Sequence, residues 1–160
     1  MIELTKLTKR FAQHTAVDNL SFQVAPGEVL GFLGPNGAGK STTMKMLTGF
    51  LEPTAGTARV FGRDIRRETI AVQRQIGYLP EGAPCYGDMS VRAFLDFIAQ
   101  VRGYRGAEQV RRVDRVLSEL ELVAEQRQSI ETLSKGFKRR VGLAQAILHD
   151  PQVLILDEPT

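Results

Sequence analysis

Short apolar segments alternate with turns at both ends of the chain, and this spacing predicts β-strands. Leu20, Phe22 and Val24 recur at every second position, which is typical of one buried face of a strand. Residues 29–33 are apolar on both faces, as expected for a central parallel strand that helices cover. Strands are therefore predicted at residues 2–7, 17–24, 28–33, 76–79 and 153–156, with a hairpin-like stretch at 56–61.

The middle of the chain repeats apolar residues every three or four positions, which predicts amphipathic helices. An earlier helix is expected at residues 40–50, where Gly49 would end it. Ser90 is a good N-cap for the next helix, another is expected at 107–122, and the last would end before Asp150. The predicted buried stripes of these three helices are Val91, Phe94, Leu95, Ile98 and Val101; Val110, Val113, Leu117 and Leu120; and Phe137, Val141, Ala144 and Leu148.

The composition excludes several classes of protein. Of the 160 residues, 42% are hydrophobic and 24% are charged, close to the average of soluble globular domains, which excludes a disordered or collagen-like chain. The longest apolar runs span a few residues, whereas a membrane helix needs about 20, so we expect no membrane-spanning segment. A single cysteine, Cys85, cannot form an internal disulfide, which favours a reducing cytosol.

The charge pattern does not favour a nucleic-acid partner. The chain has 21 basic and 18 acidic residues, and its basic residues cluster at 63–74 and 135–140. A solvated helix face explains such clusters more often than a stripe that reads phosphates, so we expect no nucleic-acid binding. His14 and His149 belong to no motif, and a surface or hydrogen-bonded structural role is expected for both.

Residues 34–41, Gly-Pro-Asn-Gly-Ala-Gly-Lys-Ser, match the pattern G-x-x-x-x-G-K-[ST] between a predicted strand and a predicted helix, as a phosphate-binding loop requires. The glycines at 34, 37 and 39 let the backbone turn so that N–H groups converge on phosphate oxygens, and the helix adds the positive end of its dipole. Lys40 would reach the β- and γ-phosphates, Ser41 would coordinate Mg²⁺ and Thr42 would contact the α-phosphate. The loop residues expected to bind nucleotide are Gly34, Asn36, Gly37, Ala38, Gly39, Lys40, Ser41 and Thr42.

Two acids follow the last predicted strand. A magnesium-dependent nucleotidase needs carboxylates beside the γ-phosphate, at the C-terminal edge of a strand that neighbours the phosphate loop. Four aliphatic residues, 153–156, would fix the strand in the core, so that Asp157 lies near Mg²⁺ and Glu158 faces the attacking water as a general base. A strand-to-turn boundary produces the same pattern, but the phosphate loop favours the catalytic interpretation.

A third motif lies between the loop and the acids. Residues 133–140, Leu-Ser-Lys-Gly-Phe-Lys-Arg-Arg, resemble the L-S-G-G-Q signature of ATP-binding-cassette (ABC) ATPases, and the chain from residue 150 onward resembles that family's junction with its Walker B strand. The resemblance covers the whole chain. It implies an α/β fold: a P-loop NTPase core with an antiparallel β subdomain at residues 1–83 and 135–160, and a helical subdomain at 84–134.

The resemblance also implies roles for residues outside the phosphate loop. In that family two cassettes pair head to tail, so Ser134 and Gly136 would bind nucleotide held by the other subunit, and Phe11 would stack on adenine. Glu81 stands where most members carry a glutamine, and it is expected to ligate Mg²⁺. Lys135 replaces a signature glycine. These two departures, Glu81 and Lys135, resemble those found in a subset of bacterial exporter-type cassettes, including the gliding-motility and copper-site-maturation subunits. Structural alternatives stay open: an N-cap for Ser134, a solvated loop acid for Glu81 and an edge-of-core ring for Phe11.

The function that the resemblance implies is the ATP-binding subunit of an ABC transporter, with ATP and Mg²⁺ as cofactors and with Glu158 and Lys40 as catalytic residues. It would hydrolyse ATP at a head-to-tail dimer interface, drive an integral membrane permease and lie on the cytoplasmic face of the inner membrane. Two alternatives stay open: a soluble ABC protein acting on ribosomes or DNA, and a nucleotide-binding fragment without turnover. Because the sequence stops within four residues of an apolar strand-like run, we expect a C-terminally incomplete cassette that hydrolyses ATP poorly alone.

Overall fold

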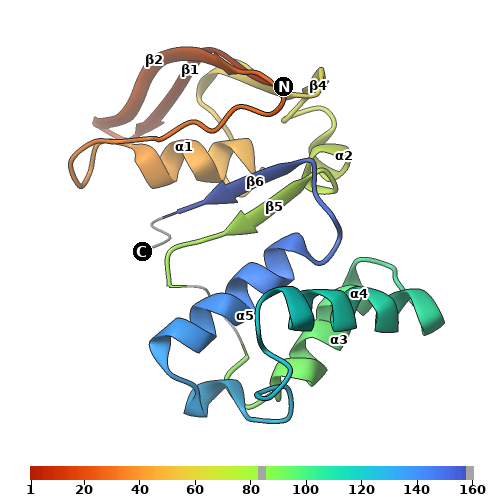
Figure 1. The fold of residues 1–160 in the computed structure, drawn as a ribbon. Helices are drawn as coiled ribbons and strands as arrows, with labels where there is room; N and C mark the ends of the chain where they lie inside the picture. Colours follow the sequence, from red (N-terminus) through yellow and green to blue (C-terminus); the bar gives the residue numbers. More distant parts are fainter. Residues whose placement is uncertain (83–85, 158–160) are drawn as a thin grey trace. The chain divides into compact units, whose positions relative to one another are not determined.

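The computed structural model describes residues 1–82 and 86–157, and the chain folds as two compact units, residues 1–75 and 76–160 (Figure 1). The first unit is built on an antiparallel sheet, and the second combines a parallel strand pair with three longer helices. The predicted α/β class, with an antiparallel β part and a helical part, is therefore confirmed. The predicted limits of the helical subdomain, 84 and 134, stay a prediction.

The antiparallel sheet of the first unit has the strand order β2-β1-β3-β4. β1 (Ile2–Phe11) pairs with β2 (His14–Val24) on one side and with β3 (Ala55–Val60) on the other, and β4 (Arg63–Asp64) lies at the edge. β1 and β2 are longer than predicted, because their backbone pairing continues through polar, exposed residues up to a two-residue turn. Apolar alternation alone does not reveal that extension. Buried residues of this sheet include Leu4, Leu7, Val17, Ala58 and Val60.

Two short helices complete the first unit. α1 (Lys40–Leu47) has Thr48 as its C-cap residue, and Gly49 follows with a φ angle of 74°. The predicted stop is therefore confirmed, although the helix is shorter than expected. α2 (Thr69–Gln73) was not predicted, since five residues without a side-chain cap give little signal. The Gln73 amide Nε2 donates to the carbonyl oxygen of Thr48 at 3.0 Å and joins the two helices.

The prediction of a strand at residues 28–33 is wrong. This segment has no strand structure, and Val29 and Leu33 are each 96% exposed. Phe32 packs against Phe22 of β2, with ring centroids 5.8 Å apart. A central parallel strand needs neighbours on both sides, whereas the described strands of the first unit all pair within the antiparallel sheet. The apolar composition therefore does not make this segment a strand within its own unit.

The second unit contains the parallel pair of β5 (Ile76–Leu79) and β6 (Val153–Leu156), both at the residues predicted from the sequence. Gly77 of β5 allows the last long helix to approach closely, because a Cβ on Gly77 would lie 2.3 Å from the carbonyl oxygen of Ala146. The helices of this unit are α3 (Val91–Val101), α4 (Gly106–Glu119), the 3-10 helix η1 (Ile130–Thr132) and α5 (Lys135–Ile147).

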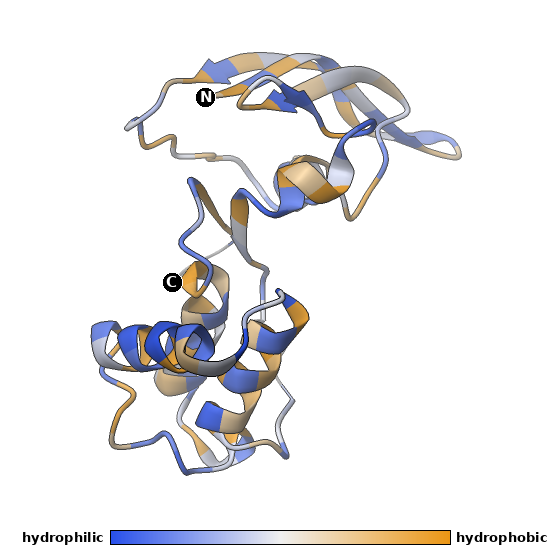
Figure 2. Cartoon of the chain, turned by 90° about the vertical axis from the view of Figure 1, so that its right-hand side faces the viewer, coloured by the Kyte–Doolittle hydropathy of each residue, from blue (hydrophilic) through white to orange (hydrophobic). Residues whose placement is uncertain are grey.

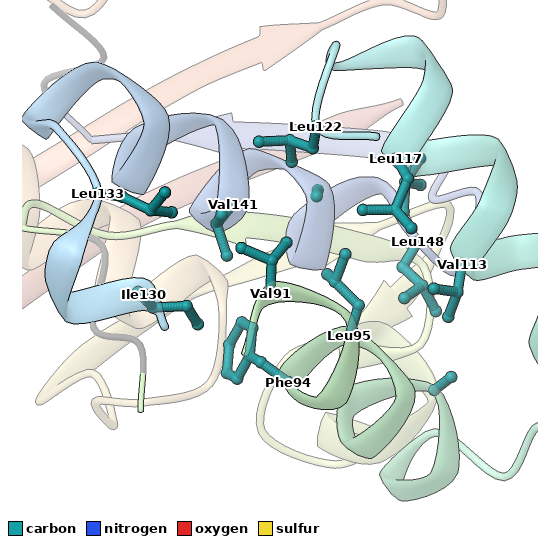
Figure 3. Close-up of a cluster of buried hydrophobic side chains, with 13 residues drawn as sticks. Val91, Phe94, Leu95, Val113, Leu117, Leu122, Ile130, Leu133, Val141 and Leu148 are labelled. Carbon is teal, nitrogen blue, oxygen red and sulfur yellow. The ribbon is translucent and has the colours of Figure 1, made fainter. Parts of the chain in front are cut away.

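The helices of the second unit share one hydrophobic core (Figure 3). Figure 2 shows hydrophobic and hydrophilic bands alternating along these helices, as the predicted amphipathic pattern requires. Val101 and Val110, which were predicted on the buried stripes, are 68% and 49% exposed, because both lie near the helix ends beside the α3–α4 connection. The core residues are Val91, Phe94, Leu95, Ala99, Val113, Val116, Leu117, Leu122, Ile130, Leu133, Val141, Ala144 and Leu148.

The helices begin largely where the sequence predicts. Ser90 is the N-cap of α3, and its Oγ accepts a hydrogen bond from the Ala93 amide at 3.2 Å, as expected. Among the described residues, none of the helices combines the length and the apolar character needed to cross a membrane. Cys85 and Glu158 lie outside the described residues.

Candidate nucleotide-binding site

The turn that precedes α1 is shaped by its glycines. Gly37 and Gly39 have φ angles of 82° and 86°, in the left-handed region that glycine adopts without strain. The Ala38 amide donates to the carbonyl oxygen of Pro35 at 3.2 Å and closes a tight turn. Backbone amides in such a turn form a concavity suited to an anion. Gly34, the third glycine of the motif, does not have a left-handed φ angle.

The start of α1 adds to this concavity. α1 begins at Lys40 with Gly39 as its N-cap residue, and no side chain caps the helix. The first amides of a helix have no intrahelical acceptor, and the helix dipole places partial positive charge at this end. A helix start without a side-chain cap therefore favours an anionic ligand.

The ammonium of Lys40 lies at the same turn. Its Nζ donates to the carbonyl oxygen of Gly34 at 2.7 Å and to that of Pro35 at 3.0 Å. These two hydrogen bonds hold the Lys40 side chain, and with it the positive charge, against the loop. A phosphate oxygen in the turn would meet an ammonium group and backbone amides together, which are strong, charge-assisted donors.

Gly39 fixes the loop to the sheet and to the helix. A Cβ on Gly39 would stand 2.3 Å from the carbonyl oxygen of Ala16 and 3.0 Å from Cγ2 of Val17, both in β2. The carbonyl oxygen of Gly39 accepts from the Thr43 amide at 2.8 Å and from Thr43 Oγ1 at 2.9 Å. Because Thr43 is buried, these contacts hold the loop in one place relative to β2 and α1.

Phe11 lies near this anchor, at the end of β1. Phe11 pairs with His14 of β2. Gly39 contacts Ala16, which lies two residues farther along β2 than His14. At the usual rise of a strand, His14 and Ala16 are about 7 Å apart. Phe11 is 45% exposed, so apolar surface is available beside the loop. The first unit therefore brings together two of the predicted elements, the phosphate loop and the ring expected to stack on adenine.

The second unit places Asp157 at the C-terminal edge of its parallel strands. Leu79 and Leu156 lie opposite each other at the ends of β5 and β6, and the Asp157 amide donates to the Leu79 carbonyl oxygen at 2.9 Å. Asp157 is only 2% exposed. The pKa of the Tyr78 hydroxyl is raised, mainly by burial and further by the Asp157 charge. The Asp157 carboxylate therefore lies close to β5 and away from solvent.

Glu81 follows β5 by two residues and emerges at the same edge, but it is exposed. In the described part of the chain, no three His, Cys, Asp or Glu side chains gather as a metal site. Mg²⁺ beside a phosphate keeps several waters and needs few protein ligands, so a hydroxyl from Ser41 with the carboxylates of Asp157 and Glu81 suits it chemically. These three residues belong to different units, and their meeting stays a prediction. Glu158, the predicted general base, lies outside the described residues.

Ser134 and Gly136 lie at the start of α5. Ser134 is the N-cap, and its Oγ accepts from the Phe137 amide at 3.4 Å, so the structural alternative for this residue is present in the fold. Both residues are exposed. A Cβ on Gly136 would lie 4.0 Å from Ser134 Oγ and meet nothing closer among the described neighbours outside its own helix turn. The packing of this chain therefore does not require a glycine at 136.

Sequence reasoning missed two residues at the site. Thr43 anchors the loop through Gly39, and only the structure reveals its buried hydroxyl contact. Lys9 lies over the Phe11 ring, with Nζ 5.1 Å from the ring centroid. A signal for Lys9 exists in the sequence, because residues two apart on a strand lie on the same face.

Comparisons with known proteins agree with these motifs. Residues 17–160 match the family model described as ABC transporter. The probable multidrug ABC transporter ATP-binding protein YbhF of Escherichia coli (strain K12) is 40% identical over 160 residues, which are 100% of this chain and 28% of that protein. The Nod factor export ATP-binding protein I of Paraburkholderia xenovorans (strain LB400) is 42% identical over 159 residues, which are 99% of this chain and 52% of that protein.

Comparison with solved structures also finds ABC transporter cassettes. The dimeric structure of a bacterial ABC transporter cassette matches with a TM-score of 0.89 and 25% identity, covering 100% of this chain and 75% of that chain. The chain thus spans 28% and 52% of the lengths of the two relatives above. Since the family model covers all but the first 16 residues, the chain belongs to the ABC transporter family of ATP-binding proteins.

Proposed function

We propose that this chain is the ATP-binding and ATP-hydrolysing part of an ABC transporter, with ATP and Mg²⁺ as its ligands. The observation that carries the proposal is the turn at residues 34–41, where left-handed glycines, a helix start without a side-chain cap and the Lys40 ammonium come together. A triphosphate suits this arrangement, because amides and an ammonium group offset several negative charges at once. Phe11 would hold the base by stacking.

In the proposed reaction, Lys40 and the loop amides hold the β- and γ-phosphates. Ser41, Asp157 and Glu81 would hold Mg²⁺, which, when bound, offsets charge on the phosphate oxygens. Glu158 would accept a proton from the attacking water, as the bond between the γ-phosphorus and its bridging oxygen breaks and ADP leaves with the electron pair. The burial of Asp157 at the end of β6 supports a fixed position for one of these acids.

A second subunit would complete the site. Ser134 and Gly136 would contact the γ-phosphate held by the partner's loop in a head-to-tail dimer. Their exposure at the start of the 13-residue α5 supports this, because a helix start suits an anion. A glycine that the chain's own packing does not require also supports close approach by a ligand.

The partner would be an integral membrane permease, with this chain on the cytoplasmic face of the membrane. The names of the relatives, a multidrug ABC transporter protein and a Nod factor export protein, support transport as the use of ATP hydrolysis. Nucleic acid is not expected as a partner. Purification of the full-length protein with a multi-span membrane subunit would support this role, whereas co-sedimentation with ribosomes or DNA would contradict it.

The direct test is ATP hydrolysis by the full-length protein and by its Glu158→Gln variant. The wild type is expected to hydrolyse ATP only with Mg²⁺, and Glu158→Gln to lose about 100-fold or more of the rate while still binding ATP. Asp88→Asn, which changes an exposed acid elsewhere in the second unit, is the control and should keep the wild-type rate. An unchanged rate in Glu158→Gln would show that the general base is wrongly assigned.

A further inference from the structure

We propose that Lys9 is a positioning residue for the base of the bound nucleotide. Its ammonium covers one face of the Phe11 ring and fixes that ring, so that the opposite face receives a purine. The inference rests on the proposed ATP site and assigns a role to a residue outside the phosphate loop.

The ammonium of Lys9 makes two contacts that fix its position. Its Nζ lies 5.1 Å from the centroid of the Phe11 ring, within the range of a cation–π interaction. The same Nζ donates to the backbone carbonyl oxygen of Glu52 at 2.7 Å. Glu52 lies in the segment between α1 and β3, so Lys9 connects that segment to the ring across the surface of the first unit.

The position of Lys9 in β1 links it to the phosphate loop. Lys9 pairs with Val17 of β2, and Val17 is one of the residues against which Gly39 packs. Phe11 follows two residues later and lies on the same face of the strand. The ring that Lys9 holds is therefore close to the anchor of the loop, at the end of the hairpin.

A fixed ring is useful because stacking requires one ring orientation. Phe11 is 45% exposed at the end of a strand, and an exposed side chain loses conformational freedom when a ligand stacks on it. A cation already placed over one face reduces that loss. The cation–π attraction arises from the quadrupole of the ring. Because Lys9 covers one face of the ring, the other face is left for a base.

The role of Lys9 is separate from that of Lys40. The Lys40 ammonium donates hydrogen bonds to the carbonyl oxygens of Gly34 and Pro35, in the turn that would hold phosphates. The Lys9 ammonium instead lies over the Phe11 ring and donates to the Glu52 carbonyl oxygen. Removal of the Lys9 charge should therefore change recognition of the base and leave recognition of the phosphates unchanged.

The test measures, by titration calorimetry on the full-length protein, the affinities for ATP and for inorganic tripolyphosphate, which has no base. Lys9→Met keeps the aliphatic stem and removes the charge, and it should weaken ATP binding about 2- to 5-fold with no change for tripolyphosphate. Lys9→Arg keeps a cation and should restore most of the ATP affinity. In a Phe11→Ala background, Lys9→Met should cause no further loss.

Lys6→Met is the matched control, because Lys6 is an exposed lysine of the same strand, and it should bind ATP like the wild type. Unchanged ATP affinity in Lys9→Met would overturn the inference, and so would an equal loss for tripolyphosphate or a full additional loss in the Phe11→Ala background. A wild-type protein that binds no ATP would instead contradict the proposed function itself, so the two failures are distinguishable.

Discussion

Gly39 lies so close to Ala16 that a Cβ on Gly39 would stand 2.3 Å from the Ala16 carbonyl oxygen. Gly39→Ala should therefore force the loop away from β2, in addition to the strain of a φ angle of 86°, and should lower the free energy of unfolding by about 2 to 4 kcal/mol. Gly37→Ala is the control, because Gly37 has a similar φ angle but open space around it. Equal losses in urea unfolding of the two variants would contradict a packing role for Gly39.

Replacement of Gly136 by alanine, unlike that of Gly39, is not expected to lower the free energy of unfolding. Alanine fits at this helical position and has the higher helix propensity, so Gly136→Ala should keep or slightly raise the free energy of unfolding. ATP hydrolysis by the full-length protein should nevertheless fall, because the added methyl group would keep the partner subunit's phosphate away. A variant with full hydrolysis would argue against a role of this helix start at the γ-phosphate.

Arginines of α4 stabilise the C-terminal end of α5. Arg115 donates to the carbonyl oxygens of Ile147 and Leu148 at 3.1 and 3.2 Å, where α5 itself has no basic residue in its last turn. Arg115→Met should lower the free energy of unfolding by about 1 kcal/mol, and the loss should shrink at high salt. Arg111→Met, at a position 75% exposed on the same helix, should change stability little. Similar effects of both variants would refute the helix-end role.

His149 gives the second unit a pH-dependent stability. Burial, with a further contribution from the Arg102 charge, lowers the pKa of His149 from 6.5 to about 4, so the ring is neutral at pH 7 and its Nε2–H donates to the Ile76 carbonyl oxygen at 3.1 Å. Below pH 6.5 the unfolded chain binds a proton that the folded chain does not, so this contribution to stability decreases as the pH falls from 6.5 toward 4. The neighbouring charges of Arg102, Arg112 and Asp150 act on the same ring.

The measurement for His149 is urea unfolding at pH 7 and pH 5. The wild type should lose about 2 kcal/mol more than His149→Gln between these two values, because glutamine keeps a donor for the Ile76 carbonyl but does not titrate in this range. Parallel losses in the two proteins would mean that His149 does not cause the pH dependence.

Local sequence signals predicted much of the fold, and the failures have a common cause. The serine that caps α3 and the apolar runs of β5 and β6 lie where they were predicted, since caps and short apolar strands depend on neighbouring residues. The segment at 28–33 was wrongly predicted as a strand, because its conformation depends on partner strands and not on its own apolar residues. The extension of β1 to Phe11 also depends on pairing.

At the candidate site, too, local sequence predicts some features, whereas others depend on tertiary packing. The phosphate-loop motif predicted a tight turn at Gly37 and Gly39, and both residues have the left-handed conformation, which is a local property of glycine. The contacts of Thr43 with Gly39 and of Lys9 with Phe11 are formed by tertiary packing, and a sequence motif does not describe them. The meeting of the acids after β6 with the loop likewise stays a prediction.

The central claim is that the turn at residues 34–41 and the Lys40 ammonium bind a triphosphate, and ATP affinity of the full-length protein tests it most directly. Lys40→Ala should weaken ATP binding about 10- to 100-fold, the size expected for lost charge-assisted hydrogen bonds to phosphate. Lys45→Ala, which changes an exposed lysine in the last turn of the same helix, should leave the affinity within about twofold of the wild type. Wild-type ATP affinity in the Lys40→Ala protein would contradict the claim.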